Sequence, residues 1–111
     1  MEELKEKSVV FSRQYASDTE EIYNYGVETF GEVQANIYEN FIDRTTNELF
    51  HSYLMYPECR WLPTKGRIYR NIILESHLII YRIKAERVEV LRVLHSKSSI
   101  SRIRTTRKIK I

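Results

Sequence analysis

The spacing of three β-rich runs in the second half of the chain constrains its fold most strongly. The runs cover residues 68–75, 77–84 and 88–94, with one residue between the first two and three residues between the last two. A parallel crossover needs a dozen residues or more, whereas a tight turn can join antiparallel neighbours. The spacing therefore predicts an antiparallel three-stranded meander, in which side chains alternate between the two faces of the sheet.

The first half of the chain is predicted to form a short strand and then two helices. Residues 9–11 are β-branched or aromatic, which is typical of a strand. Ser17 and Glu20 stand at the spacing of a capping box, and this pattern predicts a helix that starts there and ends at Gly31. A second apolar stripe predicts a longer helix from about residue 32 to about residue 54.

Gly26 lies on the apolar stripe of the first predicted helix. A glycine inside a helix costs about 1 kcal/mol relative to alanine, so its presence predicts the close approach of a second helix. The two helices would then form a hairpin that packs on one face of the sheet. The predicted class is α+β, with an N-terminal strand and a helical hairpin on one face of an antiparallel sheet.

The middle run of the meander is apolar on both of its faces. Alternation places Ile79 and Tyr81 on one face, and Leu78, Ile80 and Arg82 on the other. A single helical hairpin covers only one face of a sheet. We therefore expect the second face, which is apolar and carries arginines, to be covered either by the tail of the chain or by a second protein.

Composition limits the chain to one small domain. Its 111 residues are 42% hydrophobic and 30% charged, the ordinary balance of a globular domain, and we expect a domain over residues 1–97 with a basic tail over residues 98–111. Cys59 stands alone, so no intrachain disulfide and no cysteine-based zinc site can form, and we expect no metal or cofactor. No apolar run approaches the roughly 20 residues of a membrane span, which favours a cytoplasmic protein without membrane contact.

Charge is distributed unevenly along the chain. Residues 1–58 hold 4 Lys or Arg against 12 Asp or Glu, whereas residues 59–111 hold 14 against 3. The last 16 residues contain six basic side chains and no acid. This asymmetry favours an anionic partner for the second half, either nucleic acid or an acidic protein segment. We expect the tail to be a disordered basic arm that orders on its partner, or alternatively an added edge strand.

Several segments, in their order along the chain, resemble the RelE/ParE toxins of bacterial type II toxin–antitoxin modules, and the ParE branch most closely. These segments lie at residues 56–58, 69–70, 77–82 and 88–95. The resemblance implies a small αβ toxin that forms a hetero-oligomer with a co-encoded antitoxin, which wraps a segment over the toxin surface. We expect the antitoxin on the uncovered sheet face, through Leu78, Ile80, Arg82 and Val90.

RelE-like toxins are ribosome-dependent endoribonucleases that need charged side chains at set positions. In this chain the central RelE arginine falls at Leu78 and a sheet lysine falls at Ile72, and neither side chain can move a proton or hold a phosphate. His95 could serve as a general acid or base because its ordinary pKa is near 6.5. An alternative function is therefore cleavage of messenger RNA on the ribosome, with the candidate residues Arg70, Arg82, His95 and Lys97.

ParE toxins, by resemblance, bind DNA gyrase without covalent chemistry, hold its cleaved-DNA state and contribute to plasmid stabilisation. Such a toxin needs a contact surface and no catalytic pair. Guanidinium groups grip carboxylates or phosphates in bidentate fashion. We expect contacts to the target from Arg92, Lys97, Arg102 and Arg104. A third hypothesis is a ParE-fold protein that has lost toxicity and acts only as a binding partner.

Overall fold

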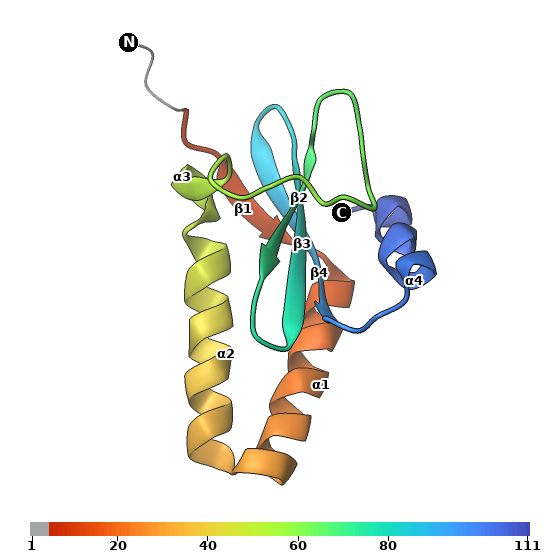
Figure 1. The fold of residues 1–111 in the computed structure, drawn as a ribbon. Helices are drawn as coiled ribbons and strands as arrows, with labels where there is room; N and C mark the ends of the chain where they lie inside the picture. The colour runs from red at the N-terminus through yellow and green to blue at the C-terminus, as the bar shows by residue number, and fades with distance from the viewer. Residues whose placement is uncertain (1–4) are drawn as a thin grey trace.

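The meander predicted from the strand spacing forms the centre of the protein (Figure 1). This computed structural model describes residues 5–111. Strands β2 (Tyr69–Ile73), β3 (His77–Ile83) and β4 (Arg87–His95) follow one another in antiparallel pairing. Strand β1 (Ser8–Phe11) lies beside β4, so the order across the sheet is β1-β4-β3-β2. The predicted α+β class is confirmed.

Strand β1 pairs with β4 in parallel, which makes the sheet mixed. The register places Ser8 opposite Arg87 and Phe11 opposite Val90. The chain between these two strands contains both helices of the hairpin, which is more than the dozen residues that a parallel crossover requires. The prediction of an antiparallel sheet is therefore correct for the meander and is corrected for the first strand.

Two long helices form the predicted hairpin, and a single helical turn follows them. Their bounds are α1 (Arg13–Phe30), α2 (Glu32–Asn47) and α3 (Leu49–Ser52). Gly31 separates α1 from α2 with a φ of +90°, a conformation that glycine adopts at little cost. A Cβ atom at Gly26 would lie 3.3 Å from the Cβ of Ala35. The predicted close approach of the two helices is therefore confirmed.

Helix α1 begins at a different serine from the one predicted. The hydroxyl of Ser12 accepts a 2.9 Å hydrogen bond from the amide of Tyr15 and donates a 2.6 Å bond to the carbonyl of Leu91. The helix therefore starts directly after β1, and Ser17 and Glu20 lie within it. The prediction of a capping box at those residues is wrong because the hydroxyl of Ser12 also bonds to β4, a contact between residues far apart in the sequence.

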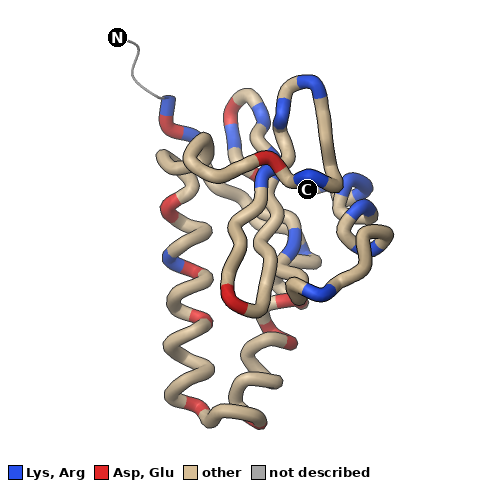
Figure 2. The backbone as a smooth tube through the Cα atoms, viewed as in Figure 1, with Lys and Arg blue, Asp and Glu red and all other residues tan. Residues whose placement is uncertain are grey.

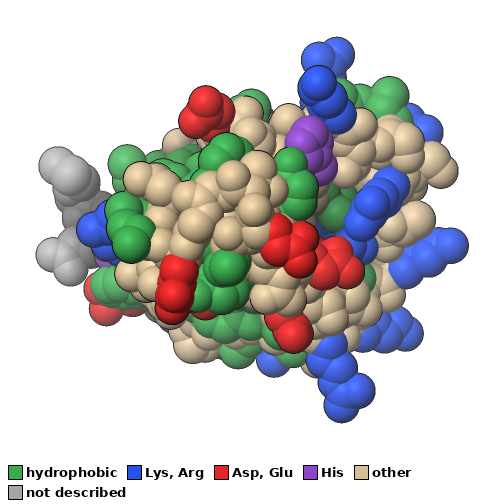
Figure 3. Space-filling view, turned by 90° about the horizontal axis from the view of Figure 1, so that it is seen from below, with side chains coloured by type: hydrophobic (Ala, Val, Ile, Leu, Met, Phe, Trp, Pro, Cys, Tyr) green, Lys and Arg blue, Asp and Glu red, His purple; other side chains and the backbone are tan. Residues whose placement is uncertain are grey.

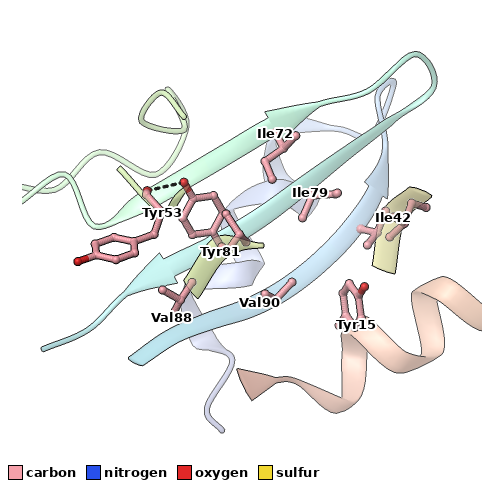
Figure 4. Packing of buried hydrophobic residues seen from close by; sticks show 10 residues of the cluster. Tyr15, Ile42, Tyr53, Ile72, Ile79, Tyr81, Val88 and Val90 are labelled. Atoms are coloured by element: carbon pink, nitrogen blue, oxygen red, sulfur yellow. Dashed lines mark hydrogen bonds between the residues drawn. The ribbon is translucent and has the colours of Figure 1, made fainter. Parts of the chain in front are cut away.

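The inner core lies between the hairpin and the sheet (Figure 4). Its buried members are Tyr15, Ile42, Leu49, Tyr53, Ile72, Ile79, Tyr81, Val88, Val90 and Val93. The hydroxyl of Tyr81 donates a 2.7 Å hydrogen bond to the carbonyl of Tyr53. Burial raises the pKa of Tyr81, so this phenol stays neutral and ties β3 to the segment after α3.

An outer core covers the opposite face of the sheet. It lies under the loop that follows α3 and under the C-terminal segment, which forms helix α4 (Ile100–Arg104) and the 3-10 turn η1 (Thr105–Lys108) (Figure 1). Its buried members are Cys59, Leu62, Tyr69, Leu78, Ile80, Leu91, Leu94, Ile103 and Ile109. Of the two covers expected for this face, the tail of the chain and a second protein, the structure shows the tail, together with the loop after α3.

The basic tail is folded onto the sheet. Ile103, Thr106 and Ile109 are buried and recur at three-residue steps, the period of a 3-10 helix, so one face of the segment is turned toward the outer core. The predicted disordered arm and the alternative edge strand are both wrong, because Ile103 and Ile109 give the tail apolar side chains to bury in the outer core. The domain boundary at residue 97 stays a prediction.

A bulge in β4 changes which side chains share a face. Ile80 lies opposite Arg92 and Tyr81 lies opposite Val90, which leaves Leu91 without a partner in β3. As a result Val90 belongs to the inner core, whereas Leu91 belongs to the outer core. Strict alternation, which placed Val90 with the outer residues of β4, fails at this position.

Arg82 joins the C-terminal segment to the sheet. Its guanidinium donates a 2.7 Å hydrogen bond to the carboxylate of Glu89, a 2.9 Å bond to the carbonyl of Ile109 and a 3.2 Å bond to the hydroxyl of Tyr69. Burial opposes the charge of Arg82, but the hydrogen bonds to Tyr69 and Glu89 raise its pKa. Arg87 also pairs with Glu89, at 2.6 Å. The buried carboxylate is therefore held between two guanidinium groups.

The residues expected to contact an antitoxin on the sheet are buried within the chain. They are Leu78, Ile80, Arg82 and Val90. Leu78 and Ile80 lie under the C-terminal segment, Arg82 is engaged by Glu89, and Val90 faces the hairpin. This expectation is corrected, because another polypeptide could reach them only by displacing parts of the protein's own core.

We predict that Arg82→Met lowers the free energy of unfolding by about 3 kcal/mol, because it leaves the buried carboxylate of Glu89 without one of its two guanidinium partners. Arg87→Met is the matched control: its guanidinium is more exposed, and we expect a smaller loss. Urea unfolding followed by circular dichroism measures both. An equal or smaller loss for Arg82→Met would show that Arg82 does not hold the C-terminal segment.

Candidate functional site

The hairpin is longer than the sheet that it covers, and its closed end projects past the strands (Figure 1). Between this end and the β2–β3 turn lies a groove with a volume of about 890 Å³. Helix α1 lines it with Ile22 and Tyr25, and α2 lines it with Ala35 and Tyr38. His77 from β3 lies on the sheet side. Residues from three distant parts of the chain therefore form one groove.

The walls of this groove are mostly apolar and its rim is mostly acidic, although Arg102 also lines it. Tyr25 is 64% exposed and Phe30 is 68% exposed, which is unusual for aromatic side chains of a folded domain. The exposed carboxylates at its rim are Glu21, Glu39 and Glu75. An exposed apolar surface bordered by charged residues is typical of a protein-binding site.

Two histidines and a tyrosine lie at the sheet end of the groove. The hydroxyl of Tyr38 and Nδ1 of His77 share a 2.7 Å hydrogen bond that joins α2 to β3. The ring centroids of His77 and His95 are 5.7 Å apart, across neighbouring strands. Burial lowers the pKa of His77, and the charge of His95 lowers it further. His77 therefore favours its neutral form within the folded protein.

The four residues of the nuclease hypothesis do not form one site. Arg70 donates hydrogen bonds to the carbonyls of Tyr56 and Arg67, both at 2.9 Å, and Arg82 is buried against Glu89. His95 and Lys97 are exposed and adjacent, and the amide of Lys97 donates to Nδ1 of His95 at 3.1 Å.

Register separates the arginine from the histidine of that hypothesis. Arg70 lies opposite Tyr81 on β3, whereas His95 lies opposite His77. The two positions are four residues apart along a strand, which corresponds to roughly 13 Å. A general acid or base and a phosphate-binding group must both lie within hydrogen-bond reach of the reacting atoms.

Of the four residues expected to contact a target, one is held in an ion pair within the protein and three are accessible to solvent. Arg92 forms a bidentate ion pair with Asp18 of α1, at 2.7 and 2.9 Å, and is largely buried. Lys97, Arg102 and Arg104 are exposed on or beside the C-terminal segment. Asp18 also accepts a 2.9 Å hydrogen bond from the amide of Val93, so this pair anchors α1 to β4.

Exposed cations extend from these residues over one side of the protein. We define the basic surface as the exposed Lys and Arg side chains of the loop after α3 and of the C-terminal segment from Arg104 on: Arg60, Lys65, Arg67, Arg104, Arg107, Lys108 and Lys110. Lys97 and Arg102 lie at its edge toward the groove. Figure 2 shows basic residues along the C-terminal segment and acidic residues along the hairpin, and Figure 3 shows the same separation on the surface.

Sequence reasoning missed the groove and its polar contacts. Asp18 follows a serine in a helical segment, and neither its sequence neighbours nor its spacing identify Arg92 as its partner. Tyr38 and His77 lie on different elements, 39 positions apart, and no sequence spacing relates them. No cluster of three or more His, Cys, Asp or Glu among residues 5–111 could hold a metal ion. No helix described here is long and apolar enough to cross a membrane.

We predict that the stability of the protein falls as the pH drops below about 6.5. The folded state lowers the pKa of His77, so the unfolded chain binds this proton more tightly and acid favours unfolding. Replacing His77 by Gln should reduce the difference in unfolding free energy between pH 7 and pH 5, while His51→Gln serves as the control. Urea unfolding at both values tests this, and an unchanged difference in His77→Gln would contradict it.

Comparison with known proteins assigns the chain to a family. The family model of the ParE toxin of the type II toxin–antitoxin system, parDE, matches residues 9–100. A solved structure of the chromosomal ParDE TA system from P. aeruginosa aligns with a TM-score of 0.67 and 20% sequence identity, over 82% of this chain and 97% of that chain. No curated protein matches the chain. The family match and the shared fold establish that the chain belongs to the ParE toxins of type II toxin–antitoxin systems.

Proposed function

We propose that this toxin inhibits DNA gyrase by binding it without covalent chemistry. The observation that supports the proposal is that both arginines of the nuclease hypothesis are engaged within the fold, whereas three of the four residues expected to contact a target are exposed. Arg70 and Arg82 of the nuclease hypothesis are engaged in contacts that hold the fold together. Lys97, Arg102 and Arg104 are exposed and free to grip an anionic target. Because gyrase acts on the chromosome, the proposal places the protein in the cytoplasm.

We predict that Lys97→Gln with Arg102→Gln raises the concentration needed for half-inhibition of gyrase supercoiling by about 10-fold or more. Each lost charge-assisted hydrogen bond is worth about 1.5–3 kcal/mol. A matched variant, Arg44→Gln with Lys84→Gln, loses the same charge on other faces of the protein and should inhibit like the wild type. Supercoiling of a relaxed plasmid by purified gyrase is the assay.

His95→Ala separates this proposal from the nuclease hypothesis. A gyrase inhibitor should keep its activity, whereas a nuclease that uses His95 as a general acid should lose on the order of 100-fold. Cleavage of messenger RNA on ribosomes, together with unaffected gyrase, would overturn the proposal. Absence of both activities would support the hypothesis of a binding protein that has lost toxicity.

The groove beside the hairpin is the proposed site of the antitoxin. Its walls hold the exposed rings of Tyr25 and Phe30, and its rim holds three carboxylates. A helical or extended antitoxin segment with apolar side chains toward the groove and basic residues beside Glu21, Glu39 and Glu75 would complement both features. This position replaces the expected one on the sheet, whose residues the chain itself covers.

We predict that Tyr25→Ser with Phe30→Ser weakens antitoxin binding by at least 10-fold, because fully burying an aromatic side chain is worth about 1.5–3 kcal/mol. Ile73→Ser is the control, since Ile73 is 74% exposed but lies outside the groove. Titration calorimetry with the product of the neighbouring open reading frame measures the affinity. Equal affinity of the groove variant and the wild type would exclude this site.

A further inference from the structure

We propose that the basic surface binds the phosphate backbone of duplex DNA directly. The inference rests on the proposed function, because duplex DNA is the substrate of gyrase. It goes beyond that function by assigning a ligand to a part of the chain that the family match does not include. The matched residues end at 100, and four cations of the basic surface lie beyond that point.

The fold brings together two stretches of sequence that contain no acid. Residues 59–74 and residues 90–111 hold no Asp or Glu, and the outer core packs one against the other. Leu62 and Ile103 belong to the same buried cluster. Arg107 lies over the ring of Tyr69, at 5.8 Å, and donates a 3.3 Å hydrogen bond to the carbonyl of Pro63. Cations far apart in the sequence therefore share one side of the protein (Figure 2).

The described carboxylates nearest to this surface are already paired. Glu89 is buried, and the hydrogen bonds from Arg82 and Arg87 overcome the effect of burial and lower its pKa. Glu58 is partly buried, lies 3.8 Å from Arg67 and accepts a hydrogen bond from the amide of Thr64. These paired carboxylates therefore do little to reduce the positive potential of the basic surface, which favours a polyanion as its ligand.

The direction of the side chains favours nucleic acid over an acidic protein segment. Along the C-terminal segment Ile103 and Ile109 are buried, while Arg104, Lys108 and Lys110 point to solvent. Protein interfaces have an apolar, often aromatic, centre, whereas interfaces with DNA are more polar and strongly positive. The two most exposed rings of residues 5–111, those of Tyr25 and Phe30, lie instead on the hairpin, whereas Trp61 beside Arg60 is only partly exposed.

The strength of the interaction should depend steeply on salt. A protein that neutralises Z phosphates loses affinity with a slope of about −0.9Z in log K against log salt. If about four of the cations contact phosphates, affinity should fall roughly 100-fold between 50 and 200 mM NaCl. This slope counts ionic contacts and is independent of any contact with gyrase.

The test is fluorescence anisotropy of a labelled 20-bp DNA duplex titrated with the purified full-length protein. We expect binding with this salt dependence, and we expect Arg104→Gln/Lys108→Gln/Lys110→Gln to weaken binding at least 10-fold at 100 mM NaCl and to make the slope shallower by about 2 to 3. The control Lys5→Gln/Arg44→Gln/Lys84→Gln loses three charges elsewhere and should bind more tightly than the test variant. Melting curves establish that both variants are folded.

Three results would overturn the proposal. The first is an affinity or slope that is the same in the test variant and the control, since binding would then not involve the basic surface. The second is tighter binding to a duplex RNA of the same sequence, and the third is tighter binding to polyglutamate, which would indicate an acidic protein partner. Gyrase is absent from this assay, so loss of DNA binding and loss of gyrase inhibition are distinguished.

Discussion

A β-sheet that is apolar on both faces must be covered on both, and the arrangement of this protein follows from that constraint. The hairpin covers the inner face around Tyr81, and the loop after α3 together with α4 and η1 covers the outer face around Ile80. The guanidinium of Arg82 donates a hydrogen bond to the carbonyl of Ile109. The C-terminal segment is therefore attached to the sheet both by apolar contact and by hydrogen bonding. Its cations are consequently turned outward.

The same constraint separates the two proposed binding sites. Because the hairpin extends past the sheet, its far end has no strand to cover and keeps exposed rings such as Phe30, together with acidic side chains. The outer layer presents mostly basic side chains, together with scattered exposed apolar ones such as Met55 and Ile100. The proposed antitoxin site and the proposed DNA-binding surface thus lie on different sides of the molecule and differ in sign of charge (Figure 3).

Local patterns predicted the strands and the hairpin, because short turns and helical periodicity act over a few residues. Local patterns do not predict contacts between residues that are distant in the sequence. The start of α1 depends on such a contact, from Ser12 to Leu91, and so does the ion pair of Asp18 with Arg92. The candidate site was predicted in part: the exposed basic residues were identified by composition, whereas the groove depends on how far the hairpin overhangs the sheet. The tail was predicted to be disordered because its isoleucines stand apart in the sequence. Ile103 and Ile109 come to lie on one face only when the segment between them is helical.

Amide hydrogen exchange of the free protein tests most directly whether the C-terminal segment is a permanent cover. Exchange at Ile103 and Ile109, whose amides donate to the carbonyls of Ser99 and Thr106, is expected to be slowed by orders of magnitude relative to an unstructured peptide. Exchange at the rate of an unstructured chain would contradict the account, since it would leave the outer face of the sheet open and the cations without a fixed surface.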